Sequence, residues 1–307
     1  MDRDVGAALR ARGYDGRAYD IERVGALRAA LEARRRAGQL DEALYAAYLT
    51  EFDDGPAAAL PGARSVVVVA VPSPPVRFTF SWRGKTFRLL VPPTYLLARE
   101  TDARAAAALA AALAPSSWRL APAAVPKKLL AVRAGLAAYG RNNVAYVAGM
   151  GSFHRLAAFY SDMPAPPATP WRGAAALERC ASCDACLKQC PTGAIAAERF
   201  LLHAERCLTF HNEMSNDVPF ADWLEPAWHD CVVGCLRCQL ACPENKDVRA
   251  WVEEGAAFSA EETEALAAGV PLAALPGEAR AKLERTGLAV LADVLPRNLR
   301  VIFDRDG

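Results

Sequence analysis

The first fifty residues repeat their apolar positions at helical spacing. In RVGALRAALEARRR, the side chains of Val24, Leu27 and Leu31 fall on one face of a helix, and LDEALYAAYL follows with a similar pattern. We therefore predict that residues 1–50 are helical. The pattern changes at ARSVVVVAV, where a short β-branched run predicts a buried strand.

A hairpin is predicted next, in VRFTFSWRGKTFRLLV. Apolar residues alternate with polar ones on both sides of Arg83-Gly84, which leaves two residues for the turn. The alternating residues are Phe78, Phe80 and Trp82 before the turn, and Phe87, Leu89 and Val91 after it.

The rest of the first domain mixes helices with strands. Thr101 and Asp102 are expected to open the Ala-rich helix TDARAAAALAAALA, and VPKKLLAVRAGLAAYG predicts another helix. NNVAYVAG and FHRLAAFY predict two further strands. Residues 1–165 are thus predicted to form an α+β domain.

Two more regions follow the proline-rich connector SDMPAPPATPWRG. Residues 174–255 hold the cysteines and form a second predicted domain. In residues 256–307, FSAEETEALAAG has a capping box at Ser259 and Glu262 and a stop at Gly269. PGEARAKLERTG predicts a second helix, so this region is expected to be a short helical C-terminal cap.

Composition narrows the class of protein. A chain of 307 residues with 53% hydrophobic residues can bury a large core without disulfides. The charged N-terminus lacks a signal-peptide pattern, and no window approaches about eighteen uninterrupted apolar residues. We predict a cytoplasmic protein with no membrane partner, where clustered cysteines indicate metal or redox chemistry.

Charge is distributed unevenly along the chain. Residues 174–255 contain 13 acidic and 7 basic residues, a balance of −6, whereas the remainder has 29 basic and 22 acidic residues, a balance of +7. This asymmetry argues against nucleic acid on the cysteine-rich face. It leaves the first domain as the side for an anionic substrate or cofactor.

All nine cysteines lie between Cys180 and Cys242. The first group has C-x2-C-x2-C-x3-C-P spacing, and the second ends in C-x2-C-x3-C-P. This is the run of bacterial two-cluster ferredoxins, in which the fourth cysteine of a group crosses to the other cluster. Paired C-x2-C motifs also build zinc sites, but eight cysteines in this interleaved pattern favour two [4Fe-4S] clusters.

The crossing pattern assigns each thiol. Cluster one is predicted to take Cys180, Cys183, Cys186 and Cys242, and cluster two Cys190, Cys207, Cys235 and Cys238. Cys207 is then the remote fourth ligand of cluster two. Cys231 is left over and is interpreted as a small buried hydrophobe.

Together with the segments upstream, the cysteines resemble the epoxyqueuosine reductase family, cobalamin-dependent iron–sulfur reductases of tRNA modification that are related to reductive dehalogenases. The resemblance covers roughly residues 60–250 and rests on LPGARSVVVVAV, PPTYLLARETDA, AVRAGLAAYGRNNVAYVAGMGSFHRLAAF, RCLTFHNE and GCLRCQLACPEN. It implies a nitroreductase-like first domain that binds base-off cobalamin and a ferredoxin-like domain whose clusters reduce the cobalt.

Two departures from the family pattern bear on the substrate. The family's proton-donating Asp corresponds to Ala121, and RLAPAAVPKKLLAVRAGL contains no acid. Family members that act on tRNA also commonly carry a C-terminal helical repeat, for which residues 256–307 are too short. We therefore predict a small or unidentified substrate and disfavour epoxyqueuosine-tRNA.

Under this resemblance the first domain supplies the site residues. Proton-donor candidates are Tyr95, Tyr139, Tyr146 and His154, each of which could instead be an amphipathic residue at a core edge. Cofactor-binding candidates are Gly140, Arg141, Asn142, Asn143, Gly151 and Ser152. His203, His211 and His229 are interpreted as structural residues near the cysteines.

Two other functions fit the same architecture. The first domain could hold a flavin, as a nitroreductase-like fold permits. Alternatively, the protein could be an electron carrier that reactivates a corrinoid partner. In each case a ferredoxin or flavodoxin is the expected electron donor.

Overall fold

The computed structural model describes residues 5–52, 55–114, 116–166, 171–173 and 176–305. The predicted mixture of helices and strands is confirmed. The chain forms two compact units that interleave along the sequence. Unit 1 comprises Met1–Pro72, Arg99–Asp184 and Ala197–Leu202, and unit 2 comprises Ser73–Ala98, Ala185–Ala196 and His203–Gly307. The predicted linear boundaries at 165, 174 and 255 do not coincide with these units, because long-range pairing takes the hairpin into unit 2.

Unit 1 contains a four-stranded antiparallel sheet of order β1-β2-β8-β5. The predicted strands are confirmed as β2 (Ser65–Pro72) and β8 (His154–Ser161). β1 (Asp15–Asp20) and β5 (Leu120–Pro122) form the two edges. The prediction that residues 1–50 are all helical was wrong at β1, since an edge strand can carry the polar residues of DGRAYD.

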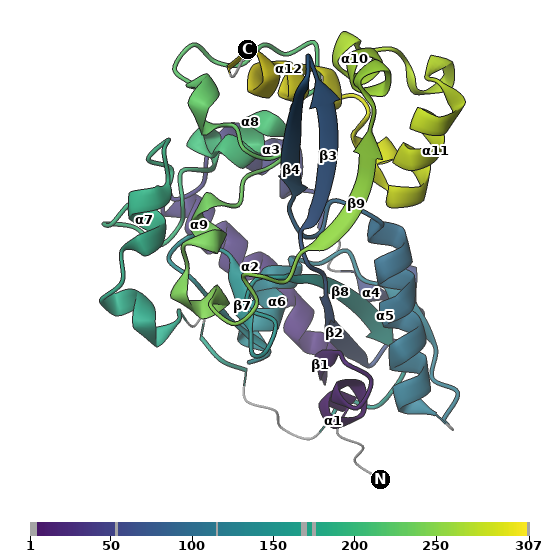
Figure 1. Ribbon diagram of the computed structural model, residues 1–307. Coiled ribbons are helices and arrows are strands. Elements are labelled where there is room, and N and C mark those ends of the chain that lie inside the picture. The colour runs from purple at the N-terminus through teal and green to yellow at the C-terminus, as the bar shows by residue number, and fades with distance from the viewer. Residues whose placement is uncertain (1–4, 53–54, 115, 167–170, 174–175, 306–307) are drawn as a thin grey trace. The chain divides into compact units, whose positions relative to one another are not determined.

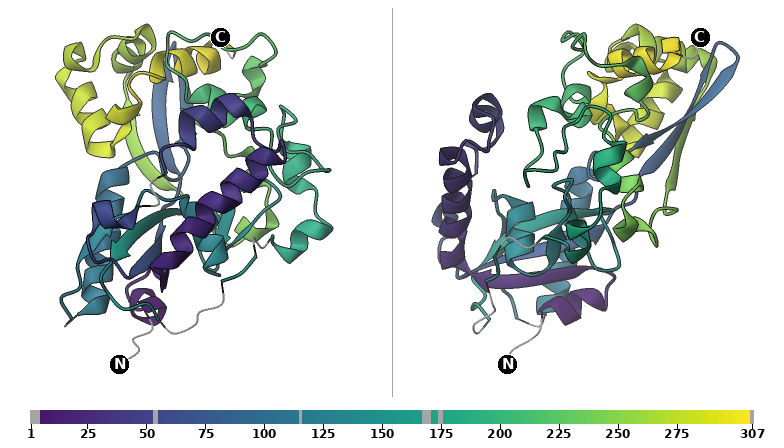
Figure 2. Two further views of the ribbon diagram at one scale, coloured as in Figure 1. Left: turned by 180° about the vertical axis from the view of Figure 1, so that it is seen from behind. Right: turned by 90° about the vertical axis from the view of Figure 1, so that its left-hand side faces the viewer.

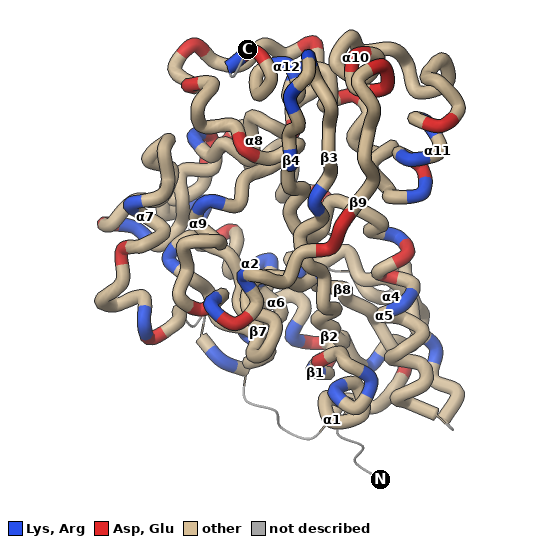
Figure 3. Tube along the Cα trace, viewed as in Figure 1, with Lys and Arg blue, Asp and Glu red and all other residues tan. Residues whose placement is uncertain are grey.

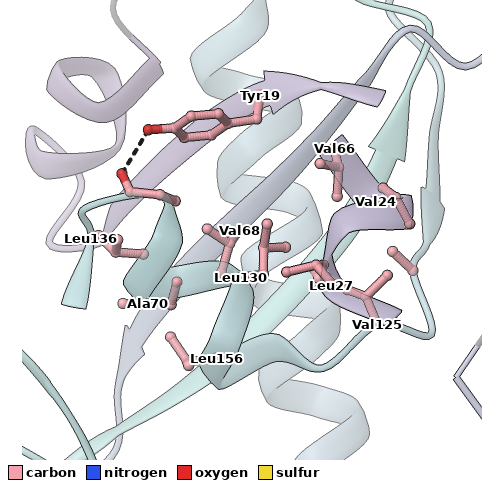
Figure 4. Close-up of a cluster of buried hydrophobic side chains, with 14 of the residues drawn as sticks. Tyr19, Val24, Leu27, Val66, Val68, Ala70, Val125, Leu130, Leu136 and Leu156 are labelled. Atoms are coloured by element: carbon pink, nitrogen blue, oxygen red, sulfur yellow. Dashed lines mark hydrogen bonds between the residues drawn. The ribbon is translucent and has the colours of Figure 1, made fainter. Parts of the chain in front are cut away.

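Helices cover both faces of this sheet. α1 (Val5–Arg10) and α5 (Ala98–Leu113) pack on one face, and α2 (Val24–Arg36) and α6 (Lys127–Arg133) pack on the other. Figure 2 (left) shows α2 in front of the sheet in the view from behind. In the core of that face, the Tyr19 hydroxyl donates a hydrogen bond to the Ala134 carbonyl at 2.9 Å (Figure 4).

Four helical segments complete or correct the predictions for unit 1. The helix predicted at LDEALYAAYL is confirmed as α3 (Glu42–Tyr48), and α4 (Pro56–Ala59) is a single turn. α5 begins at Ala98, ahead of the predicted Thr101. α6 ends at Arg133 because Gly135 takes a left-handed φ of 65°, and the chain continues as a strand.

That strand is β6 (Ala137–Tyr139), which pairs antiparallel with β7 (Ala145–Val147). The predicted helix over VPKKLLAVRAGLAAYG is therefore correct only in its first half. The prediction of a strand in NNVAYVAG is confirmed by β7. The two strands enclose the loop 140–144, which carries four of the predicted cofactor-binding residues.

Unit 2 is built on a three-stranded sheet of order β4-β3-β9 (Figure 1). The hairpin is confirmed: β3 (Val76–Trp82) and β4 (Lys85–Val91) are antiparallel, and both turn residues have left-handed φ values of 47° and 79°. β9 (Glu253–Phe258) pairs parallel with β3 and was not predicted. Its start is acidic, as Figure 3 shows, so it lacks the apolar alternation of a half-buried strand.

Three C-terminal helices pack against this sheet. α10 (Ala260–Ala268) has the predicted capping box at Ser259 and Glu262, and α11 (Gly277–Thr286) confirms the second predicted helix. α12 (Leu295–Arg305) buries Phe303 against the hairpin. The hairpin and the predicted C-terminal cap thus share one core.

Short helices carry the cysteines. They are α7 (Ala185–Gln189), α8 (Leu208–Asn212) and α9 (Arg237–Leu240), with 3-10 turns at Glu178–Ala181 and Pro243–Asn245. Among the described residues, no helix combines the length and apolar character that a membrane span requires.

Candidate iron–sulfur and cofactor sites

The four cysteines assigned to cluster two all lie in unit 2. Cys190 follows α7, Cys207 is the N-cap of α8, Cys235 precedes α9 and Cys238 lies within α9. Burial raises the pKa of Cys207, and Cys190 raises it further. Burial also raises the pKa of Cys235 to about 12, with Asp230 and Cys207 adding to the effect. These effects place Cys190 near Cys207, and Cys207 near Cys235.

Hydrogen-bond donors surround two of these thiols. The backbone N–H groups of Thr209 and Phe210 and the Thr209 hydroxyl counteract the rise in the pKa of Cys207. The backbone N–H of Arg237 does the same for Cys235. Buried thiolates that accept backbone hydrogen bonds are typical ligands of an iron–sulfur cluster, so this donor set fits cluster two.

Cys231 differs from its neighbours. Its side chain is only 3% exposed, and burial raises its pKa well above the usual value. Its backbone forms a parallel bridge with Leu90 of β4, and the Val232 N–H donates to the Leu90 carbonyl at 2.9 Å. This position extends the sheet and accords with a small apolar residue.

The cysteines assigned to cluster one are divided between the units. Cys180 and Cys183 belong to unit 1, and Cys186 and Cys242 to unit 2. Their common ligation of one cluster stays a prediction from spacing. In the part of the chain that the structure describes, no three His, Cys, Asp or Glu side chains are placed to hold a single metal ion.

The turn of the loop 140–144 is closed by hydrogen bonds within the loop and to Tyr146. The Asn142 amide donates to the Tyr146 hydroxyl at 2.9 Å, and the Gly140 N–H donates to the Val144 carbonyl at 2.8 Å. A Cβ on Gly140 would lie 2.5 Å from the Asn142 Oδ1, so this position requires glycine. Asn142 and Tyr146 are therefore part of the loop's interior.

Arg141 makes three contacts that the sequence analysis did not predict. Its backbone N–H donates to the Cys180 Sγ at 3.4 Å, and its guanidinium donates to the Cys180 carbonyl at 2.6 Å and the Ala197 carbonyl at 3.3 Å. The sequence interpretation, in which Arg141 binds cofactor amides or a substrate anion, missed these contacts. They join segments far apart in the chain, and no local pattern reveals them.

Asn143 is the loop residue best placed to receive a ligand. It adopts a left-handed φ of 59° and is partly exposed, and its carbonyl accepts from Lys128 Nζ at 3.3 Å. Its side-chain amide has no hydrogen-bond partner among the described residues. A neutral amide suits the amide-rich rim of a corrin, so the residues present fit cobalamin at this point.

The other predicted residues of unit 1 are buried. Gly151 and Ser152 form the turn before β8, and His154 is 6% exposed with Nδ1 3.1 Å from the Gly151 carbonyl. Burial lowers the pKa of His154 to about 4, so the imidazole is neutral at pH 7. Burial raises the pKa of Tyr139 to about 12. Neither residue is a ready acid at neutral pH.

Carboxylates are scarce in this part of unit 1. No Asp or Glu occurs between residues 103 and 161, and Ala121 lies on β5 opposite Tyr160. The flanking acids are held in ion pairs: Asp102 accepts two hydrogen bonds from Arg155, at 2.7 and 2.8 Å, and Asp162 pairs with Arg119 at 2.7 Å. Both carboxylates are thus engaged by cations.

Tyr95 lies in unit 2 and not with the other predicted proton donors. Its hydroxyl donates to the Glu213 carboxylate, and burial together with this acid raises the pKa of Tyr95 well above its usual value. Cys207 and Cys231 contribute to that rise, which places Tyr95 beside the cluster two segments. Its assignment to the first domain was wrong because PPTYLL continues from the hairpin.

The three histidines near the cysteines are embedded in unit 2. Nε2 of His211 lies 3.0 Å from the Glu205 carbonyl, and Nδ1 of His203 lies 3.1 Å from the Glu205 carboxylate. His229 is 1% exposed, and its ring nitrogens have no hydrogen-bond partner among the described residues. The structural roles of these three histidines stay a prediction.

Helix α12 supplies polar residues that the sequence analysis overlooked. The Asn298 amide donates to the carbonyls of Asn212 at 2.9 Å and Val232 at 3.0 Å, and the Asn212 amide donates to the Gly234 carbonyl at 2.8 Å. Arg297 donates to the His211 carbonyl at 2.7 Å. The available signal was the polar pair Arg297-Asn298 on the apolar side of an amphipathic helix.

Comparison with known families identifies the cysteine-rich segment. Residues 179–245 match the family described as 4Fe-4S double cluster binding domain. The chain therefore carries a double [4Fe-4S] domain, in agreement with the two interleaved cysteine groups.

Curated relatives make the resemblance more specific. Epoxyqueuosine reductase of Burkholderia pseudomallei is 36% identical over 126 residues, which cover 39% of this chain and 30% of the relative. The Escherichia coli enzyme is 33% identical over 133 residues, which cover 43% of this chain and 33% of the relative. The matched segment thus spans about a third of these relatives.

Solved structures extend the likeness to nearly the whole chain. Epoxyqueuosine reductase of Bacillus subtilis, with an aspartate-bearing catalytic loop swung out of the active site, has a TM-score of 0.66 at 20% identity and covers 98% of this chain and 80% of that one. The Streptococcus thermophilus enzyme has a TM-score of 0.64 at 15% identity, with the same coverage. The chain shares their fold, and the resemblance to the epoxyqueuosine reductase family is confirmed.

Proposed function

We propose that this protein is an iron–sulfur reductase that passes electrons through two [4Fe-4S] clusters to a bound cobalamin, which reduces a substrate. The observation that carries the proposal is the double [4Fe-4S] cysteine pattern of residues 179–245, four of whose thiols, those assigned to cluster two, lie together in unit 2. A ferredoxin or flavodoxin is the proposed donor. When bound, cobalamin supplies a strongly reducing cobalt centre.

Residues of this chain would tune the clusters and position the cofactor. The thiolates and their backbone donors set the potential of the clusters, since hydrogen bonds to sulfur and solvent exposure tune it. The free amide of Asn143 would bind the cofactor rim, and the buried loop residues behind it would hold that amide in place. That the first domain has a nitroreductase-like fold is part of this proposal.

The substrate is proposed to differ from epoxyqueuosine in tRNA. This rests on the absence of Asp and Glu from residues 103–161 and on the ion pairs that engage Asp102 and Asp162. A missing general acid typically lowers a rate ~10²–10⁴-fold. A substrate whose reduction needs no strong proton donor suits such a site.

A second candidate function is epoxyqueuosine reduction itself. The names of the relatives favour it, and an epoxyqueuosine reductase solved with a modified tRNA stem loop has a TM-score of 0.64 at 21% identity and covers 98% of this chain and 80% of that one. Tyr146 would then have to replace the missing acid, because its hydroxyl lies at the loop and accepts from Asn142.

One set of measurements tests the proposal. Anaerobically reconstituted protein should contain about eight iron atoms per chain, and should change the visible spectrum of added cobalamin. Asn143→Ala should weaken that change, whereas Asn216→Ala in unit 2 should not. An iron content near four, bound zinc, or no spectral change would contradict it. A flavin released by acid would favour the flavin alternative.

The substrate is tested separately. Reduced protein with cobalamin is incubated with a tRNA stem loop that contains epoxyqueuosine, and the nucleoside is followed by mass spectrometry. We expect conversion at least ~10²-fold slower than by an epoxyqueuosine reductase that has its aspartate. Conversion at an equal rate would establish the second candidate function.

A further inference from the structure

Arg141 contacts Cys180 through both its backbone and its side chain. The N–H to Sγ distance of 3.4 Å is that of a hydrogen bond to sulfur, and the guanidinium reaches the Cys180 carbonyl at 2.6 Å. A third bond, to the Ala197 carbonyl at 3.3 Å, anchors the same guanidinium to the segment that follows the first cysteine group. All three partners belong to unit 1.

The surrounding backbone keeps these two residues together. Tyr139 forms a parallel bridge with Ala176, and the Leu177 N–H donates to the Tyr139 carbonyl at 2.8 Å. The strand that enters the loop therefore runs beside the segment that leads to Cys180. Gly140 and Asn142 fix the conformation of the turn. In that conformation the Arg141 N–H already points to the Cys180 sulfur.

We propose that Arg141 is a positioning residue that raises the reduction potential of the cluster to which Cys180 is assigned and fixes this cluster's ligand to the loop 140–144. The inference rests on the proposed function. A reduced cluster carries one more negative charge than the oxidised cluster. An N–H donor to its sulfur and a nearby guanidinium both stabilise that charge, and both therefore raise the potential.

The contacts also separate Arg141 from substrate binding. Its guanidinium is committed to two carbonyls, and its Nε atom is buried. A residue that gripped a substrate anion would present these donors to solvent. Two residues of the loop thus have different roles. Arg141 contacts Cys180, and the side-chain amide of Asn143 stays available to a ligand.

The test is a redox titration of reconstituted full-length protein, followed by the EPR signals of the two reduced clusters. Arg141→Ala should lower one of the two midpoint potentials and leave the other unchanged. Arg141→Lys retains the charge and the backbone N–H, so it should lower the same potential by less. Arg36→Ala removes an equal charge from an exposed position at the end of α2 and should shift neither.

The outcomes are distinguishable from a failure of the proposed function. Wild-type protein without two clusters would overturn the function and this inference together. Two clusters in the wild type, with both potentials unchanged in Arg141→Ala and Arg141→Lys, would overturn the inference alone. If Arg141→Ala loses four of about eight irons while Arg141→Lys keeps them and shows the smaller shift, the positioning role is supported.

Discussion

In unit 2, the segments that carry Cys207 and Cys235 are bonded to a helix far away in the sequence, whereas in unit 1 the turn of the loop 140–144 is closed by bonds within the loop and to Tyr146, and Arg141 adds bonds to Cys180 and Ala197. The side-chain amide of Asn298 in α12 donates hydrogen bonds to the carbonyls of Asn212 and Val232, and the Asn212 amide donates to the Gly234 carbonyl. In the loop, Asn142 bonds Tyr146 four residues away. Irregular cysteine segments lack a ladder of their own, so buried side chains from elsewhere must satisfy their backbone groups.

This difference predicts how far the structural effect of a mutation extends from the mutated residue. A change in the unit 1 loop should alter the local fold and leave the cluster two ligands in place. A change in the network of unit 2 should reach several cysteine segments, because one amide of Asn298 serves two of them. The two regions are thus expected to respond to mutation in different ways.

The largest expected effect is the loss of a cluster. Cys207→Ser should remove about four of eight irons, because Cys207 is assigned as the remote ligand of cluster two. Cys231→Ser is the control, as Cys231 is the more buried of the two cysteines and its backbone is bridged to Leu90. Iron and sulfide analysis measures both. Equal iron loss in the two variants would refute the ligand assignment.

Next in size is the removal of the α12 network. Asn298→Ala leaves two buried carbonyls without their donor, and each unsatisfied group costs about 1–3 kcal/mol, so we expect a loss of roughly 2–6 kcal/mol. Cluster two should also release its iron faster to a chelator. Arg300→Ala changes an exposed residue of the same helix and should alter stability by less than about 0.5 kcal/mol.

Thermal melting and the rate of iron release measure this pair of variants. If Asn298→Ala melts like the wild type, the network does not hold the cysteine segments. If it melts earlier but releases iron at the wild-type rate, α12 stabilises unit 2 without supporting the cluster.

Much of the fold could be predicted from the sequence because the signals were local. The hairpin at Arg83-Gly84, the helix α10 with its capping box and the buried strand β2 follow from short-range patterns. The cysteine spacing likewise predicted the double [4Fe-4S] domain. Each of these depends on residues within a few positions of one another.

The failures came where distant segments decide the outcome. β1 and β9 are edge strands whose acidic residues mask their period, and they form by pairing with β2 and β3. Under the family resemblance, Tyr95 was predicted to be a proton donor and Arg141 a cofactor-binding residue, without knowledge of their contacts. Their partners, Glu213 and Cys180, lie 118 and 39 residues away, so no local pattern could indicate them.

A smaller effect is expected in the pH dependence of folding stability, through His154 of unit 1. His154 has its pKa lowered from 6.5 to about 4, so the unfolded chain binds a proton that the folded chain does not between these values. Stability should therefore fall as the pH drops from about 6.5 towards 4, by about 1.4 kcal/mol per pH unit at most. His154→Gln should reduce this slope without abolishing it, because burial also lowers the pKa of His229 to about 4, and His203→Gln, at a partly exposed site, should leave it unchanged.

Chemical denaturation at several pH values measures the slope. The clusters should be absent from these samples, so that cluster loss does not contribute to the transition. A slope as steep in His154→Gln as in the wild type would show that His154 does not contribute to it.

The smallest expected effect comes from a change in the loop 140–144. It tests whether this loop and the cysteine segments of unit 2 are independent. Gly140→Ala places a Cβ 2.5 Å from the Asn142 Oδ1 and 2.6 Å from the Tyr146 ring, and such overpacking typically costs about 1–3 kcal/mol. Gly25→Ala is the control, since nothing lies within 4 Å of its added Cβ in α2, and it should stabilise the protein by about 0.4–1 kcal/mol. Because the loop is held by its own residues, Gly140→Ala should weaken cobalamin binding and lower the melting temperature, yet leave the ligands of cluster two, and hence the EPR signal of that cluster, unchanged. Loss of that signal in Gly140→Ala, with Gly25→Ala intact, would mean that the loop also supports the second cysteine group and that the two regions are not independent.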